Sequence, residues 1–259
     1  MVVGLSKFVE HLKGFEDCFV LIGGTACDLW MESVGLQFRA TRDLDVVLIS
    51  ESLGPDFQRL FWDFIELGRY REQSRSSHTP PFYRFVQPDS DGFPAMIELF
   101  SNEFLELPDS AVLTPIPAGD ELISLSAILL DDESYQYLLG SKIDIDGIPT
   151  VPGSTLIPLK AAAWSDLKRR QKAGEPVKSR DIKKHRNDVF LLYLSLKPGD
   201  RYALPDTLQA PFHELLQALP PDSPDWNAIR ASIRSQGLEL PDPATVLQTV
   251  GEIFEVPEF

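Results

Sequence analysis

The stretch that decides the fold is CFVLIGGTACDLWMESV, residues 18–34. Its five leading apolar residues end at Gly23-Gly24, a pattern that predicts a short buried strand and a tight turn. Beyond the turn, apolar residues recur at the spacing of one helix face: Ala26, Leu29, Trp30 and Val34. The sequence therefore predicts a strand that passes into a helix at the glycine pair.

The flanking segments alternate between helical and extended patterns. Apolar residues at helical spacing over 6–13 and 56–67 predict two helices. Short apolar runs predict strands over 43–49, 82–86 and 95–101. Together these elements predict an α+β fold in which helices flank a mixed sheet.

The rest of the chain has a different pattern. Between 102 and 153 proline and glycine are dense, which predicts a peripheral linker region with short strands or helices at 122–130, 135–139 and 142–145. Helical patterns then follow at 156–171, 179–195, 206–218, 224–235 and 243–254. We expect one domain over 1–153, linker included, and a helical C-terminal lobe over 154–259.

The composition bounds the class of protein. The chain has 259 residues, of which 43% are hydrophobic, enough to bury a core. No apolar run approaches the roughly 20 residues that span a bilayer, and the N-terminus lacks a signal-peptide pattern. We expect a cytoplasmic protein that does not enter the membrane, with Cys18 and Cys27 as packing residues and not a disulfide.

The charge is unevenly distributed. A net charge of -15 argues against a protein that coats nucleic acid non-specifically. The segment 160–186 nevertheless carries ten Lys or Arg against three acids, so the remainder of the chain carries -22. This basic segment is either a solvated helix face or a site for phosphates.

Gly23-Gly24-Thr25 lies where the predicted strand meets the helix. Glycine lets the backbone approach a phosphate, and the free N–H groups of the helix point toward it. Glycine pairs are also common in tight turns, so this feature alone leaves both interpretations open.

Asp43 and Asp45 point to a metal site. Side chains two apart on a strand share one face, and two carboxylates there repel each other unless a cation holds them. Magnesium takes oxygen ligands from one or two carboxylates and from substrate phosphates. A second pair, Asp144 and Asp146, precedes Gly147, and this Asp-Gly sequence predicts a hairpin turn with no catalytic role.

Glu98 is a third acid, in the otherwise apolar run AMIELF, residues 95–100. An acid in such a run either faces solvent at a sheet edge or joins a charged site. Three acids on two strands behind a glycine turn are what two magnesium ions need for in-line phosphoryl displacement.

At this point the sequence resembles a known family. Gly23-Gly24-Thr25 followed by RATRDLD, residues 39–45, resembles the glycine-glycine-(Ser/Thr)…Asp-x-Asp signature of the polymerase-beta-like nucleotidyltransferases. Residues 39–45 are similar, more narrowly, to the Arg-x-(Ser/Thr)-x-Asp-(Leu/Ile)-Asp of the AbiEii/AbiGii-type branch, whose members include toxins of type IV toxin–antitoxin pairs. The resemblance covers 18–49, 95–101 and, less closely, 156–192.

The resemblance implies a nucleotidyltransferase-like mixed sheet and a set of functional residues. Asp43, Asp45 and Glu98 would be the catalytic, metal-binding carboxylates, with two Mg²⁺ ions as cofactors. The nucleotide would contact Gly23, Gly24, Thr25, Arg39, Thr41, Lys160 and Asp188. A nucleoside triphosphate, an RNA or transfer RNA acceptor and an antitoxin protein are the partners that the family suggests.

Three of the later residues have simpler interpretations. Lys160 could be a helix-surface lysine instead of a phosphate ligand, and Asp188 could cap a helix or form a salt bridge to a basic neighbour. His185, amid basic residues, is expected at the surface and not in a zinc site, because no second ligand lies at the right spacing.

The leading function is transfer of a nucleoside monophosphate from a nucleoside triphosphate to a hydroxyl acceptor. Two alternatives remain open. One is a small-molecule nucleotidyltransferase of the antibiotic-modifying kind, and the other is a catalytically silent family member that binds a nucleotide or a partner protein.

Overall fold

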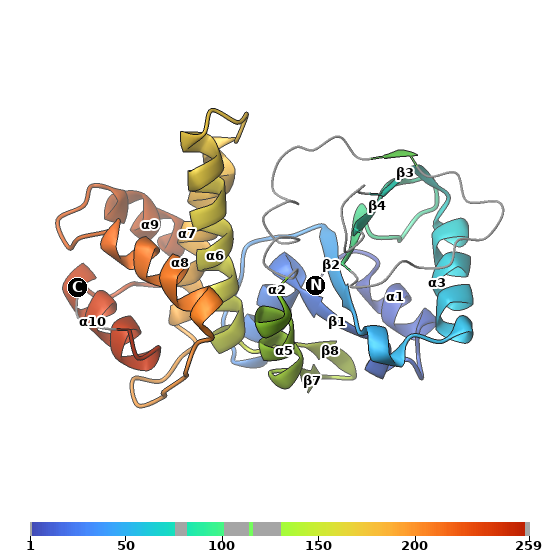
Figure 1. Ribbon diagram of the computed structural model, residues 1–259, viewed down its shortest axis with the longest axis horizontal. Coiled ribbons are helices and arrows are strands. Elements are labelled where there is room, and N and C mark those ends of the chain that lie inside the picture. The colour runs from blue at the N-terminus through green and yellow to red at the C-terminus, as the bar shows by residue number, and fades with distance from the viewer. Residues whose placement is uncertain (1, 76–81, 101–113, 116–130, 257–259) are drawn as a thin grey trace. The chain divides into compact units, whose positions relative to one another are not determined.

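The structure, a computed structural model, describes residues 2–75, 82–100, 114–115 and 131–256. It has an α+β fold, which confirms the predicted class (Figure 1). The chain forms two compact units. Unit 1 comprises Met1–Trp30, Ala40–Ala118 and Lys142–Val151, and unit 2 comprises Met31–Arg39, Gly119–Ser141 and Pro152–Phe259.

These units differ from a simple division of the chain. The expected boundary at 153–154 lies two residues from the boundary at 151–152, but the segment 31–39 belongs to unit 2. The chain therefore enters unit 2 in the last turn of the helix that follows the glycine pair. It returns to unit 1 just before Thr41.

Unit 1 is built on a mixed six-stranded sheet in the order β1-β2-β5-β4-β3-β6. Its strands are β1 (Phe19–Ile22), β2 (Asp43–Leu48), β3 (Tyr70–Arg75), β4 (Phe82–Pro88), β5 (Met96–Phe100) and β6 (Thr114–Pro115). β2 pairs with β5 in parallel, as β3 does with β6, and the other pairs are antiparallel.

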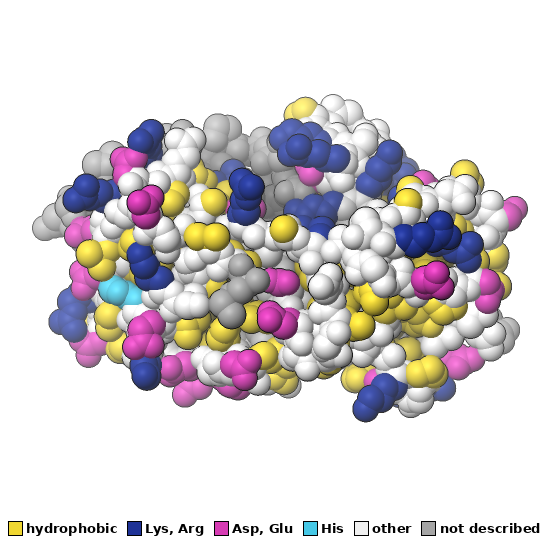
Figure 2. All heavy atoms as spheres, turned by 180° about the vertical axis from the view of Figure 1, so that it is seen from behind, with side chains coloured by type: hydrophobic (Ala, Val, Ile, Leu, Met, Phe, Trp, Pro, Cys, Tyr) yellow, Lys and Arg dark blue, Asp and Glu magenta, His cyan; other side chains and the backbone are white. Residues whose placement is uncertain are grey.

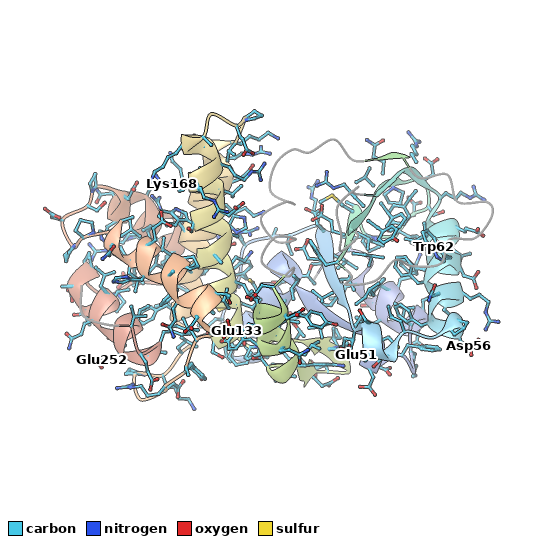
Figure 3. The ribbon with its side chains drawn as sticks, viewed as in Figure 1. Glu51, Asp56, Trp62, Glu133, Lys168 and Glu252 are labelled. Atoms are coloured by element: carbon cyan, nitrogen blue, oxygen red, sulfur yellow. The ribbon has the colours of Figure 1, made fainter. Side chains whose placement is uncertain are left out.

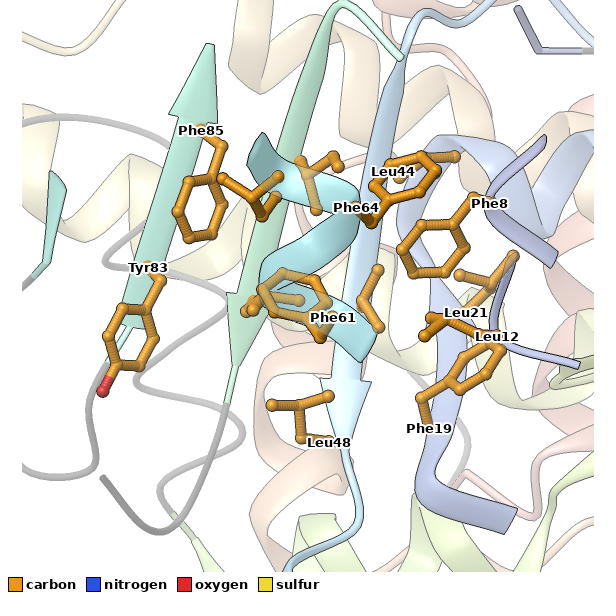
Figure 4. Packing of buried hydrophobic residues seen from close by; sticks show 14 of the residues in the cluster. Phe8, Leu12, Phe19, Leu21, Leu44, Leu48, Phe61, Phe64, Tyr83 and Phe85 are labelled. Atoms are coloured by element: carbon orange, nitrogen blue, oxygen red, sulfur yellow. The ribbon is translucent and has the colours of Figure 1, made fainter. Parts of the chain in front are cut away.

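One face of this sheet is apolar and carries the core of unit 1. The helices α1 (Leu5–His11) and α3 (Pro55–Gly68) pack against it. Figure 4 shows Phe8, Phe61 and Phe64 from these helices over the strands. The strand residues in this core alternate along the chain: Leu44, Val46 and Leu48 on β2, Ile97 and Leu99 on β5, and Tyr83 and Phe85 on β4.

The alternation decides where the acids lie. Successive side chains of a strand point to opposite faces. Since Leu44, Ile97 and Phe85 face the core, Asp43 and Asp45, Glu98, and Arg84 face the other side of the sheet. Four charged residues thus share the face that the core helices leave uncovered.

Two local features differ from the sequence prediction. The helix after β1 begins at the glycine pair itself, as α2 (Gly23–Ser33), so both glycines belong to its first turn. β3, with the sequence YREQSR, was not predicted, because its polar composition lacks the apolar run of a buried strand.

The region before the long helices contains α5 (Asp132–Gly140) and the hairpin of β7 (Ile143–Ile145) and β8 (Ile148–Thr150). Asp146 and Gly147 both have positive φ, 53° and 80°, which confirms the predicted Asp-Gly hairpin turn. The predicted piece at 122–130 lies outside the described residues. The short 3-10 helices are η1 (Glu16–Cys18) and η2 (Ser50–Ser52).

The described part of unit 2 is helical. Its helices confirm the predicted series: α6 (Gly153–Lys172), α7 (Ser179–Tyr193), α8 (Asp206–Gln217), α9 (Asp225–Arg234) and α10 (Pro243–Ile253). Among the described helices, none is long and apolar enough to cross a membrane. Cys18 and Cys27 are both buried and are not joined in a disulfide, as expected of packing residues.

Candidate active site

The charged face of unit 1 carries a continuous row of residues across neighbouring strands. Asp45 on β2 lies opposite Glu98 on β5, and Glu98 lies opposite Arg84 on β4. At the other end of the row, Asp45 lies opposite Ile22, the last residue of β1 before the glycine pair. The strand register therefore brings the glycine turn, the Asp-x-Asp pair and Glu98 together.

Gly23 is in direct contact with Asp45 of this row. Its φ is +67°, and a β-carbon at this position would lie 1.6 Å from Oδ2 of Asp45. No side chain fits there, so glycine is required both for the backbone conformation and for the space. The Asp45 carboxylate consequently lies against the start of α2.

Gly24 makes a similar approach to Thr41. A β-carbon on Gly24 would lie 2.7 Å from Oγ1 of Thr41. Two residues of the motif at 39–45 thus pack against the two glycines, Thr41 against Gly24 and Asp45 against Gly23. The glycine pair and the segment 39–45 therefore depend on each other for space.

Thr25 connects α2 to β2 through a hydrogen bond. Its Oγ1 donates a 2.7 Å hydrogen bond to the carbonyl oxygen of Asp43, and the residue is completely buried. The hydroxyl therefore fixes the first residue of the Asp-x-Asp strand. For an anion, the start of α2 offers backbone N–H groups and the positive end of the helix dipole.

Glu98 is buried among charges. Its side chain is 8% exposed, and Nε of Arg84 donates a 2.9 Å hydrogen bond to its Oε1. Burial raises the pKa of Glu98 well above its ordinary value, and the charge of Asp45 and a hydrogen bond with it raise it further, whereas Arg84 lowers it. Two neighbouring carboxylates repel each other when both are ionised, so the pair occupies a place that suits a cation.

The residues fit a magnesium ion. Asp45 and Glu98 are direct partners on β2 and β5, Asp43 shares their face two residues earlier on β2, and all three offer only oxygen ligands. Among the described residues, no group of three or more His, Cys, Asp or Glu side chains is arranged to hold a metal ion. Magnesium does not need such a cage, because one or two carboxylates together with substrate phosphates are sufficient.

Arg84 is the site residue that sequence reasoning missed. It is the lone charge in FYRFV, residues 82–86, the same signal that singled out Glu98. The signal was available, but the register that sets Arg84 opposite Glu98 depends on strand pairing that the sequence does not specify.

Three of the expected nucleotide-binding residues lie in unit 2 and form a buried ion cluster. Asp188 on α7 accepts hydrogen bonds of 2.8 and 2.7 Å from Nε and Nη2 of Arg39, and Nζ of Lys160 on α6 lies 3.3 Å from the same carboxylate. The side chains of Asp188 and Lys160 are 3% and 7% exposed. Burial acts to raise the pKa of Asp188, but Lys160 and Arg39 together lower it to about 2.

This cluster decides between the interpretations of its members. Lys160 is not a helix-surface lysine, since it is buried against Asp188. Asp188 forms a salt bridge, which was one of its two simpler interpretations. The expectation that His185 is at the surface is wrong: it is 5% exposed, and burial, then Lys160, lowers its pKa well below the ordinary value.

The basic segment 160–186 divides into buried and exposed parts. Besides Lys160, the buried members are Arg170, paired with Glu175, and Arg186, paired with Asp225. The exposed members are Arg169, Lys172, Lys178, Arg180 and Lys183. Figure 2 shows dark blue side chains gathered toward the top of the view, where the end of α6 and the start of α7 lie. Lys168, labelled in Figure 3, lies over the ring of Trp164 at 5.7 Å.

Comparison of the sequence with protein-family models and with curated proteins found no match.

Proposed function

We propose that the chain is a magnesium-dependent nucleotidyltransferase that moves a nucleoside monophosphate from a nucleoside triphosphate to a hydroxyl acceptor. One observation carries the proposal: Asp45 and Glu98 are direct partners across β2 and β5, and Asp45 also lies against Gly23 at the start of α2. The carboxylates that would bind cations therefore lie next to the start of α2, which would bind phosphates.

Each residue has a chemical task in the proposed reaction. The backbone at the start of α2 binds the triphosphate, and Asp43 and Asp45 hold magnesium, with Glu98 as a further ligand. Bound magnesium would neutralise charge on the phosphates and on the leaving oxygen. The acceptor oxygen forms a bond to the α-phosphorus, the bond to the β-phosphate oxygen breaks, and pyrophosphate leaves.

Glu98 is the proton acceptor in this proposal. The acceptor hydroxyl loses its proton as the new P–O bond forms, and a carboxylate whose pKa is raised by burial accepts a proton more readily near neutral pH. Glu98 lies farther along the row from the glycine pair than Asp45 does. The acceptor therefore approaches from the side of β5 and β4, opposite to the triphosphate.

An RNA end is the proposed acceptor. The exposed cations of α6 and α7 offer a charged surface that an RNA backbone binds and a small neutral acceptor does not need. A small-molecule acceptor is the alternative if these cations have no effect. A role as a toxin in the cytoplasm with an antitoxin partner follows only from the resemblance, and inspection of the neighbouring gene is its first test.

A second candidate is a silent family member that binds a nucleotide or a partner protein. The observation in its favour is that Lys160, expected at the phosphates, is buried and held by Asp188. In this case the acidic row would bind a metal and nucleotide without transfer.

The test is incorporation of each of the four labelled nucleoside triphosphates, with and without bulk transfer RNA, in magnesium or in EDTA. We expect magnesium-dependent labelling of RNA with release of pyrophosphate, lost in Asp45→Asn. Labelling of a small acceptor alone would favour the alternative enzyme. Nucleotide binding without any transfer would favour the silent protein.

A further inference from the structure

The guanidinium of Arg84 is paired with Glu98, the carboxylate that the proposed function assigns to a metal ion. Its Nε lies 2.9 Å from Oε1 of Glu98, and the two residues are direct cross-strand partners on β4 and β5. The Glu98 side chain is 8% exposed and that of Arg84 is 29% exposed. A guanidinium paired with so buried a carboxylate is a persistent interaction and not a fluctuating surface contact.

A guanidinium and a divalent cation compete for the same carboxylate. Both are attracted to it, but they repel each other over the few ångströms that separate neighbouring strands. While Arg84 holds Glu98, a cation bound at Asp43 and Asp45 gains little from Glu98. A bound triphosphate changes this balance, because its negative charge offsets that of the guanidinium.

We propose that Arg84 is an internal counter-cation that keeps Glu98 from binding metal until the nucleotide arrives. The inference rests on the proposed function. It predicts one metal site in the nucleotide-free protein, at Asp43 and Asp45, and recruitment of Glu98 to metal only when a triphosphate is bound. Arg84 thereby makes assembly of the complete site depend on the substrate.

The experiment measures Mn²⁺ binding by the paramagnetic resonance signal of free Mn²⁺, with and without a non-hydrolysable triphosphate analogue. At about pH 8 protons compete less for the carboxylates. In the absence of nucleotide, Arg84→Met should raise the affinity about tenfold, because Glu98 is released from the guanidinium and becomes available as a ligand of the cation. Glu98→Gln should change it little, and the double variant Arg84→Met/Glu98→Gln should lose the gain, which isolates the coupling of the two residues.

Two further variants control for folding and for charge. Arg84→Lys keeps the charge and should bind Mn²⁺ as the wild type does. Arg71→Met removes an arginine that pairs with Asp89 on the same sheet and should leave Mn²⁺ affinity unchanged. If Arg84→Met does not fold, Arg84→Gln replaces it.

The outcomes separate this inference from the proposed function. If wild-type Mn²⁺ binding is enhanced by the nucleotide and lost in Asp45→Asn, but is unchanged or weakened in Arg84→Met, the inference is wrong and the proposed function stands. If the wild type binds no Mn²⁺ even with the nucleotide, both are wrong. A gain in Arg84→Met that disappears in the double variant supports both.

Discussion

Gly23 packs directly against the carboxylate of Asp45, and a β-carbon on Gly23 would lie 1.6 Å from Oδ2 of Asp45. The contact joins the first residue of α2 to the last residue of the Asp-x-Asp motif, 22 residues later in the sequence. It links the phosphate side of the proposed site to its metal side through a single glycine.

Gly23→Ala should therefore displace Asp45 and abolish metal-dependent transfer. The substitution has two costs: a positive φ of 67°, worth about 1 kcal/mol, and a steric overlap that the Asp45 side chain has to relieve by moving. The measurements are Mn²⁺ binding and thermal unfolding.

Gly14→Ala is the matched control for this variant. Gly14 has a φ of +89°, yet a β-carbon there would meet nothing within 4 Å. It should show the backbone cost alone, with Mn²⁺ binding and transfer intact. Equal Mn²⁺ affinities in the two variants would contradict a role for the Gly23–Asp45 contact.

Asp45→Asn should abolish transfer without unfolding the protein. The amide keeps the shape of the side chain but loses the charge that binds a cation. Without metal, the variant should be at least as stable as the wild type, because the repulsion between Asp45 and the buried Glu98 is removed.

The control is Asp146→Asn in the β7–β8 hairpin. Asp146 has a φ of 53°, a conformation that asparagine also adopts readily, so both folding and transfer should be unaffected. A folded and active Asp45→Asn variant would place metal binding elsewhere in the chain.

The acidic row could be predicted from the sequence only in part. Asp43 and Asp45 share a face because successive side chains of a strand point to opposite faces. Glu98 stands out as the one charged residue in the apolar run AMIELF. Strand order and register are long-range properties, however, so neither the direct pairing of Asp45 with Glu98 nor the presence of Arg84 could be derived. The burial of His185 was misjudged and the two interpretations of Lys160 stayed open for the same reason, since the burial of both residues depends on how α6 and α7 pack together.

Asp188→Asn should lower the stability of the protein at neutral pH. The substitution leaves Lys160 and Arg39 without their buried carboxylate, and breaking a buried ion pair in this way costs about 3–5 kcal/mol. Denaturant unfolding at pH 7 measures the loss. Asp56→Asn, which removes an exposed pair with Arg59, should cost less than about 1 kcal/mol.

The stabilisation by Asp188 should also depend on pH. The pKa of Asp188 is lowered in the folded state, from an ordinary value of 3.8 to about 2. Its contribution is therefore present above pH 3.8 and is lost as the pH falls toward 2. The difference in unfolding free energy between wild type and Asp188→Asn should narrow over that range. A constant difference would contradict the ion-pair origin of the effect.

The last prediction concerns the acceptor. Charge reversal in the basic segment 160–186 tests an RNA acceptor. Arg170 is a poor choice for it, because it is buried and paired with Glu175. Better choices are Lys172, Lys183 and Lys184, which are exposed or half-buried near the end of α6 and on α7. Changing these three to glutamate should weaken RNA binding and reduce the slope of log Kd against log salt by about 0.7 for each lost contact with a single strand. Binding of the triphosphate should be nearly unchanged. The triple variant Lys197→Glu, Arg201→Glu and Arg234→Glu changes three exposed cations elsewhere in unit 2 and controls for the change in net charge. If both sets of variants bind and label RNA equally, the basic segment is a solvated surface and a small-molecule acceptor becomes the better hypothesis.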